Sequence, residues 1–179
     1  ILDLSAIESG KLQIENMDFD PEMMAHDICD IITPSIDADR VEIICDIDRD
    51  VPGYVNGDPG RIRQVLINLM GNAVKFTSDG EIELKLGVEA VQEDQWRFHY
   101  QVKDTGRGIH PDKMELIFDT FTQEDQSIKI KYGGTGLGLS ICREIAKKLG
   151  GDIWVESKLG SGSIFHFSAL MKRSERKAR

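Results

Sequence analysis

Three polar side chains suited to a metal ion and a phosphate recur along one stretch of the sequence. Asn68, Asn72 and Lys75 stand four and then three residues apart, a spacing that puts them on one face of an α-helix. A carboxamide oxygen is a hard, neutral ligand that suits Mg²⁺, and a lysine can meet a phosphate. The alternative is a solvent-facing polar stripe, but asparagine is a poor helix former, which favours a binding role.

A glycine-containing loop follows a predicted strand further along the chain. Residues 104–109 are Asp-Thr-Gly-Arg-Gly-Ile. The Asp104 carboxylate can accept a hydrogen bond from the exocyclic amine of adenine, whereas guanine offers a carbonyl at that position. Gly106 and Gly108 would let the backbone approach the base closely. Taken alone, the pattern is more typical of an ordinary turn after a strand, so its interpretation depends on the other clusters.

A second glycine cluster runs directly into a predicted helix. Glycines alternate at Gly134, Gly136 and Gly138, which frees backbone N–H groups to face an anion at the helix N-terminus. Lys129 and Lys131, just upstream, could add positive charge. The sequence contains no P-loop, and neither the dinucleotide-binding fingerprint nor the Ser/Thr protein kinase motifs apply.

The elements that must position these residues alternate between helices and strands. Hydrophobic periodicity predicts helices over residues 21–37, 58–76, 111–118 and 137–149. Alternation and turn residues predict strands over residues 41–47, 81–91, 96–103, 152–157 and 163–170. Phe118 and Phe121 are predicted to anchor the loop that follows them in the core. This order predicts an α+β two-layer sandwich with a largely antiparallel sheet, and not a doubly wound parallel sheet.

Composition and charge restrict the partners. The 179 residues are 40% hydrophobic and 30% charged, with a formal net charge of −9, so we expect a globular domain that binds neither nucleic acid nor an anionic membrane. No stretch approaches the roughly 20 apolar residues of a membrane helix, and we find no leader. Three isolated cysteines indicate a reduced compartment. We therefore expect a cytoplasmic domain, or the cytosolic part of a membrane-bound receptor, taken from a longer chain because the sequence begins with Ile1.

In this order, the clusters resemble the catalytic ATP-binding domain of sensor histidine kinases. That domain shares a wider family with DNA gyrase, the ninety-kilodalton heat-shock chaperone and the MutL mismatch-repair proteins. The resemblance implies their Bergerat-type fold, a mixed, mostly antiparallel sheet covered on one face by helices. Residues 68–77 are similar to the N box, 104–109 to the G1 box, 118–121 to the F box and 134–138 to the G2 box.

The resemblance also implies how the chain is divided. It implies that residues 1–15 end a dimerisation helix, that 16–171 form the ATP-binding catalytic domain, and that 172–179 are a basic linker. The Phe-Thr-Gln-Glu-Asp run over residues 121–125 and the basic tail resemble those of hybrid kinases.

Roles for individual residues follow from the resemblance where the motifs match. Asn72, with Asn68 beside it, would hold Mg²⁺, and Asp104 would read the adenine of ATP. Residues 122–132 would form a lid, in which Lys129 or Lys131 has to replace an arginine that the family often carries. The full set expected at ATP is Asn68, Asn72, Lys75, Asp104, Gly106, Gly108, Ile109, Phe118, Lys131, Tyr132, Gly134, Thr135, Gly136, Leu137 and Gly138.

Position 68 separates the activities of the wider family. Gyrase-like and MutL-like ATPases carry a water-activating glutamate where this chain has Asn68, which has no useful basicity. The resemblance therefore implies transfer of the γ-phosphoryl group to an external nucleophile. That acceptor would be a histidine on the dimerisation domain of a homodimer, and a response regulator or receiver domain would take the phosphate next. The alternatives are a nucleotide-binding regulatory module without kinase activity and an ATPase of the gyrase or MutL kind.

The acceptor histidine is not recognisable in this sequence. His26-Asp27 does not fit the acceptor motif, because Ile31 stands where the motif has proline and the pair follows residues 1–15 rather than preceding them. Without an acceptor, we expect the fragment to be inactive in isolation. Structural or solvated roles are expected for His99, His110 and His166.

Overall fold

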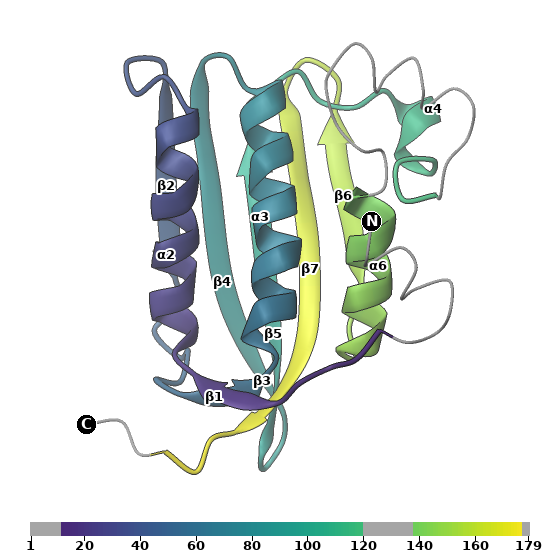
Figure 1. Cartoon of the computed structure of the whole chain (residues 1–179). Coiled ribbons are helices and arrows are strands. Elements are labelled where there is room, and N and C mark those ends of the chain that lie inside the picture. Colours follow the sequence, from purple (N-terminus) through teal and green to yellow (C-terminus); the bar gives the residue numbers. More distant parts are fainter. Residues whose placement is uncertain (1–11, 120–137, 177–179) are drawn as a thin grey trace.

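A mixed β-sheet with helices on one face forms the domain (Figure 1). The computed structural model describes residues 12–119 and 138–176. In these ranges the elements are β1 (Met17–Phe19), α2 (Pro21–Ile32), the 3-10 helix η1 (Thr33–Ser35), β2 (Val41–Ile47), β3 (Val55–Gly57), α3 (Pro59–Phe76), β4 (Gly80–Gln92), β5 (Gln95–Asp104), α4 (Pro111–Met114), α6 (Gly138–Lys148), β6 (Ile153–Lys158) and β7 (Gly162–Arg173). No helix within these ranges has the length and apolar character needed to cross a membrane.

The sheet confirms the predicted α+β architecture. Its strand order is β1-β3-β7-β5-β4-β2, and β6 pairs with β7 beside this path. Every pairing is antiparallel except that of β2 with β4, which is parallel. The β4–β5 hairpin and β7 make up the centre, and α2, α3 and α6 lie side by side over one face, with α3 in the middle (Figure 1).

Alternation along the central strands separates a core face from an open face. On β4 and β5 the helix-facing residues are fully buried: Ile82, Leu84, Leu86, Phe98, Tyr100 and Val102. Their sequence neighbours, such as Glu83 and His99, point to the opposite face. On α3 the predicted apolar stripe is buried against them, with Ile62, Val65, Leu66 and Leu69 at most 1% exposed. The core therefore lies between α3 and the sheet centre.

Asp58 fixes the start of α3. Its Oδ1 accepts the backbone N–H of Arg61 at 3.0 Å, as an N-cap does, and Pro59 occupies the first turn. Its Oδ2 accepts the backbone N–H of Glu15 at 2.9 Å. The carboxylate is 6% exposed, so it joins the chain before β1 to the helix that carries the polar stripe.

The boundaries of some elements differ from those predicted. The predicted helix over residues 21–37 ends at Ile32, where the Thr33 hydroxyl donates to the Cys29 carbonyl at 2.8 Å and the chain tightens into the 3-10 turn that contains Pro34. The predicted helix over 111–118 is helical only over Pro111–Met114 and continues as turns. Strands β1 and β3 were not predicted at all.

The last strand is longer than predicted. β7 continues to Arg173 instead of ending at 170, because Lys172 pairs with Asn56 of β3 and the Arg173 N–H donates to the Asp94 carbonyl at 2.9 Å. The first two residues of the predicted basic linker are thus part of the sheet.

Replacing Asp58 by alanine should destabilise the domain. The change leaves the Arg61 and Glu15 N–H groups without the carboxylate, so we expect the free energy of unfolding to fall by about 1–2 kcal/mol. Urea denaturation followed by circular dichroism measures this. Asp20→Ala removes the N-cap of α2, whose bond to the Met23 N–H is solvent-exposed, and should cost less. Equal losses in the two variants would contradict a linking role for Asp58.

Candidate functional site

The predicted polar stripe lies on one face of α3. Asn68 and Asn72 are half-buried and Lys75, in the last turn, is exposed, whereas Leu66 and Leu69 on the opposite side are buried. The Asn68 carboxamide lies against Gly138, the first residue of α6: a Cβ atom there would stand 2.7 Å from its Oδ1 and 2.9 Å from its Cγ. Because glycine has no side chain, the N-terminus of α6 can approach α3 closely. The structure thus brings together two of the predicted clusters.

Asp104 ends the central strand β5 as a buried carboxylate. It is 5% exposed, and its Oδ1 accepts the Gly106 N–H at 2.9 Å. The backbone N–H of Ser163, opposite it on β7, also stabilises the ionised carboxylate. Burial raises the pKa of Asp104, and the two N–H groups offset part of that rise. The side chain is therefore held in one orientation, with its remaining acceptor capacity directed away from these two donors.

The loop after Asp104 packs on the end of α3. A Cβ atom at Gly106 would collide with the Phe76 carbonyl oxygen and stand 2.9 Å from its carbon. The Arg107 N–H donates to the same carbonyl at 3.4 Å, and its guanidinium carbon lies 4.4 Å from the centre of the Phe76 ring. These contacts set Gly106 beside the α3 turn that carries Lys75. A cavity of about 290 Å³ opens there, lined by Lys75, Phe76, Ser78, Asp79, Thr105, Gly106 and Arg107.

Gly108 and Ile109 meet a different element. Gly108 has φ +72°, a backbone conformation that favours glycine, and a Cβ atom there would stand 2.8 Å from the Lys158 carbonyl carbon. The Ile109 N–H donates to the Ser157 hydroxyl at 2.8 Å. Ser157, at the end of β6, was not among the predicted site residues. The sequence held no stronger indication of it than its place just before the polar, glycine-rich turn at 158–162.

Phe118 acts as the predicted core anchor. It is 6% exposed, packs edge-to-face against Phe165 of β7 with ring centres 6.3 Å apart, and lies 5.0 Å below the Arg143 guanidinium of α6. It therefore fixes the segment after α4 between the sheet and α6.

Part of the predicted site falls outside the described residues. This applies to Phe121, the lid over 122–132 with Lys129, and Lys131, Tyr132, Gly134, Thr135, Gly136 and Leu137, whose roles stay predictions.

The donors on α3 fit a magnesium ion that arrives with phosphates. Within the described ranges no group of three or more His, Cys, Asp or Glu side chains could hold a metal by itself. Mg²⁺ commonly takes one or two protein oxygens and completes its octahedron with phosphate oxygens and water. The half-buried, neutral carboxamides of Asn68 and Asn72 offer such a partial set.

The family model that matches this chain decides its identity. A model described as "Histidine kinase-, DNA gyrase B-, and HSP90-like ATPase" matches residues 57–173, which include α3, the loop after β5 and α6. The chain belongs to this family. The prediction of a histidine kinase ATP-binding domain made from the four motifs is confirmed.

Curated relatives of this histidine kinase domain are much longer proteins. The peroxide stress-activated histidine kinase mak2 of Schizosaccharomyces pombe is 39% identical over 177 residues, 96% of this chain and 8% of that protein. The sensor protein GacS of Pseudomonas syringae pv. syringae is 37% identical over 174 residues, 97% of this chain and 19% of that protein. The chain thus spans less than a fifth of either relative.

Solved structures of histidine kinases share the fold. Full-length ShkA, crystallised in complex with AMPPNP, superposes with a TM-score of 0.80 at 30% identity, covering 99% of this chain and 36% of ShkA. The catalytic domain of the histidine kinase ThkA superposes with a TM-score of 0.67 at 28% identity, covering 89% of this chain and 99% of that domain. The predicted Bergerat-type fold is therefore confirmed.

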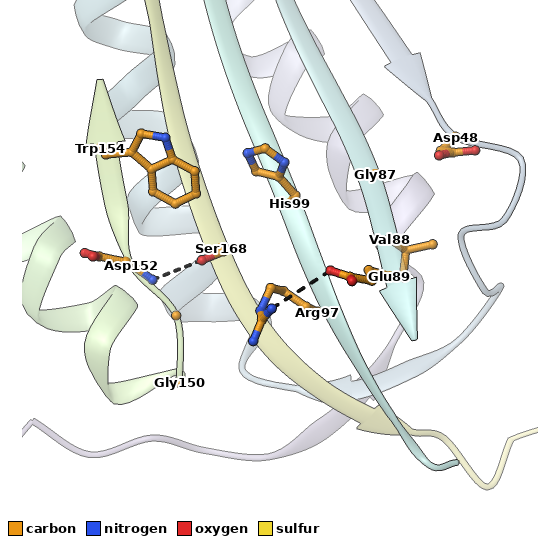
Figure 2. A pocket seen from close by; sticks show the side chains of 11 residues that line it. Asp48, Gly87, Val88, Glu89, Arg97, His99, Gly150, Asp152, Trp154 and Ser168 are labelled. Carbon is orange, nitrogen blue, oxygen red and sulfur yellow. Dashed lines mark hydrogen bonds and ion pairs between the residues drawn. The ribbon is translucent and has the colours of Figure 1, made fainter. Parts of the chain in front are cut away.

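A larger cavity of the histidine kinase domain lies away from these motifs. It measures about 650 Å³ and opens on the sheet face opposite the helices, where Figure 2 shows His99, Trp154 and Arg97 projecting from the strands. His99 Nε2 hydrogen-bonds His166 Nδ1 at 2.9 Å, and the Trp154 ring stacks on His166 at 5.0 Å. His166 Nε2 meets a Glu156 carboxylate oxygen at 2.7 Å. None of the predicted nucleotide-site residues lines this cavity, and both histidines have structural partners.

Adding a side chain at Gly106 should destabilise the domain, because the loop packs tightly on the end of α3. The same change at Gly71 should show only the effect of helix propensity. In Gly106→Ala the new Cβ displaces either the loop or the end of α3, so we expect a loss of about 1–3 kcal/mol in the free energy of unfolding. Gly71→Ala is the matched control, since a Cβ there meets nothing within 4 Å in the middle of α3, and it should stabilise by about 0.5–1 kcal/mol. Urea titrations of both variants test this; a Gly106→Ala protein as stable as the parent would show that the contact is loose.

His99 should make stability depend on pH. Burial, and then the neighbouring His166, lower the pKa of His99 below its ordinary value of 6.5. As the pH falls, the unfolded chain therefore takes up a proton on His99 at a higher pH than the folded chain does. The contribution of neutral His99 to the free energy of unfolding should be fully present above about pH 6.5. It should decrease as the pH drops towards the lower folded pKa. His99→Gln should flatten this part of the curve of unfolding free energy against pH; parallel curves would contradict the assignment.

Proposed function

We propose that this domain binds Mg²⁺–ATP and transfers the γ-phosphoryl group to a histidine on a separate dimerisation domain of its own full-length, homodimeric chain. A response regulator or a receiver domain would then take the phosphate. The observation that carries the proposal is that the ends of two other elements meet α3, which bears the polar stripe: the loop after the buried Asp104 of β5 packs on Phe76, and Gly138 of α6 lies against Asn68. The proposal places the domain in the cytoplasm, where ATP is available and where Cys29, Cys45 and Cys142, all free thiols in this structure, would stay reduced.

Each of these elements would contribute a different interaction with the nucleotide. Asp104 would accept a hydrogen bond from the adenine amine, while Gly106 lets the backbone lie close to the base plane. Asn72 and Asn68 would hold Mg²⁺, which neutralises the charge that develops on the phosphates during transfer. Lys75, at the adjacent end of α3, would add a positive charge beside them. Phosphoryl transfer depends mainly on such positioning and charge neutralisation.

Asn68 supports transfer over hydrolysis. A carboxamide has no basicity with which to take a proton from water. It can still contribute an oxygen to the metal and pack against α6, as its contact with Gly138 suggests. A domain with these groups would hold ATP until an external imidazole reaches the γ-phosphate.

A reconstituted transfer reaction tests the proposal. The chain is mixed with a separately expressed dimerisation domain that carries the acceptor histidine, together with ATP labelled on its γ-phosphate. We expect acid-labile, base-stable phosphohistidine on the added domain. Asp104→Asn replaces a carboxylate, which only accepts hydrogen bonds, by a carboxamide with one accepting oxygen and one donating NH₂ group. It should weaken Mg²⁺–ATP binding about 10- to 100-fold. Asn72→Ala should remove transfer, while the matched surface change Asp46→Asn, at an exposed ion pair with Lys85, should leave both unchanged.

The other outcomes point to the alternative functions. Tight ATP binding without phosphohistidine would support a regulatory nucleotide-binding module. Steady release of inorganic phosphate without an acceptor domain would support an ATPase. Unchanged binding in Asp104→Asn would show that the adenine lies elsewhere.

A further inference from the structure

The loop at 105–109 is held on its far side by the β6–β7 turn. The Ile109 N–H donates to the Ser157 hydroxyl at 2.8 Å, and the Gly160 N–H donates to the Arg107 carbonyl at 2.7 Å. The positive-φ Gly108 lies directly on the backbone of Lys158, as described above. The loop is therefore held at three places: to the start of β4 through Thr105 and Glu81, to the end of α3 through Gly106 and Arg107, and to the end of β6 through Ile109.

Ser157 uses all of its hydrogen-bonding capacity in this arrangement. Its O–H donates to the Gly162 carbonyl at 3.0 Å, and its oxygen lies 2.8 Å from the Ser163 hydroxyl. A serine has one donor and can accept two hydrogen bonds. Because the donor is directed at Gly162, the hydroxyl of Ser163 donates to Ser157, and the second acceptor position takes the Ile109 N–H. The loop is thus fixed to a side chain whose own orientation is fixed.

This network also reaches Asp104. Ser163 lies opposite Asp104 in the β5–β7 ladder, and its backbone N–H offsets part of the rise that burial causes in the pKa of the carboxylate. Hydrogen bonds therefore run from Ile109 through Ser157 to the Ser163 hydroxyl, and Ser163 is the ladder partner of Asp104. The two ends of the loop are held to one another across the β6–β7 hairpin.

We propose that Ser157 is a positioning residue for the nucleotide: its hydroxyl holds the 105–109 loop in the shape that lets Asp104 and Gly106 meet the base. The inference rests on the proposed function. A loop already ordered by folding does not lose conformational freedom when the ligand binds, so more of the contact energy appears as affinity. Ser157 itself would not touch the ligand. It acts through Ile109 and through the backbone on either side.

Three variants of the full 179-residue chain test the role of the hydroxyl. Ser157→Ala removes it, Ser157→Thr keeps it on a side chain that strands favour, and Ser161→Ala removes an exposed hydroxyl from the same turn. Dissociation constants for Mg²⁺–ADP and Mg²⁺–ATP are measured by calorimetry. We expect the affinity of Ser157→Ala to fall about fivefold to tenfold, with Ser157→Thr and Ser161→Ala within about twofold of the parent.

Two further readouts separate positioning from general stability. Amide hydrogen exchange without nucleotide should become faster at Ile109 in Ser157→Ala, while exchange in the core of β5, at Tyr100, stays slow. In the reconstituted transfer, the KM for ATP should rise with kcat at saturating ATP nearly unchanged, because the phosphate-binding groups on α3 are intact.

The results that would contradict the role of Ser157 differ from those that would contradict the proposed function. If Ser157→Ala binds nucleotide as well as the parent, the positioning role is wrong and the proposed function stands. If Ser157→Thr is impaired as much as Ser157→Ala, the loss comes from packing and not from the hydroxyl, which also overturns the inference. If the parent chain binds no adenine nucleotide at all, the proposed function fails and the inference fails with it.

Discussion

The burial of one stripe of α3 against β4 and β5 decides where the rest of the site can lie. Ile62, Val65, Leu66 and Leu69 point into the sheet, and since the helix is regular over Pro59–Phe76, Asn68, Asn72 and Lys75 have to face away from those residues. The same packing places the last turn of α3 next to the end of β5. Phe76 can then receive the loop that carries Gly106, and the gap beside α3 can receive α6. A rotation of α3 about its axis would break both contacts together.

The charge of the domain and the charge of its proposed ligand have the same sign. The chain carries −9 overall, and Asp104 adds a buried carboxylate at the site itself. The repulsion between the Asp104 carboxylate and the phosphates is limited because the two would lie at different places. The carboxylate lies at the loop over 104–109, whereas Lys75 and the carboxamides lie on α3. The positive end of the α6 dipole at Gly138 is on the same side as Asn68. Under the proposed function a bound Mg²⁺ would add further positive charge, so the affinity for the phosphates would depend on Mg²⁺.

The sequence predicted elements with strong local patterns and missed those made by distant pairing. The helix that begins at Pro59 after the Asp58 cap and the strand over 41–47 were predicted within a residue, because a cap, a proline and alternating β-branched residues determine them locally. β1 and β3 are three residues each, too short for a period, and exist because each pairs with a distant segment. Ser157 was missed for a related reason, since its importance lies in a contact 48 residues away in sequence. The order of the four motifs in the sequence was enough to identify the family. It did not predict the hydrogen bonds that hold these motifs in place.

The two halves of the site are built by different physics, and this limits what can change between substrate and product. The half around Asp104 depends on directed hydrogen bonds inside the protein, from Gly106 to the carboxylate and from Ile109 to Ser157. The half on α3 offers the half-buried, neutral carboxamides of Asn68 and Asn72 and the exposed side chain of Lys75, which under the proposed function would meet the phosphates and the metal. Under the proposed function, the base contacts are therefore the same for ATP and ADP. The difference between the two nucleotides falls on α3 and on α6 at Gly138, because those are the described elements that would face the lost phosphate.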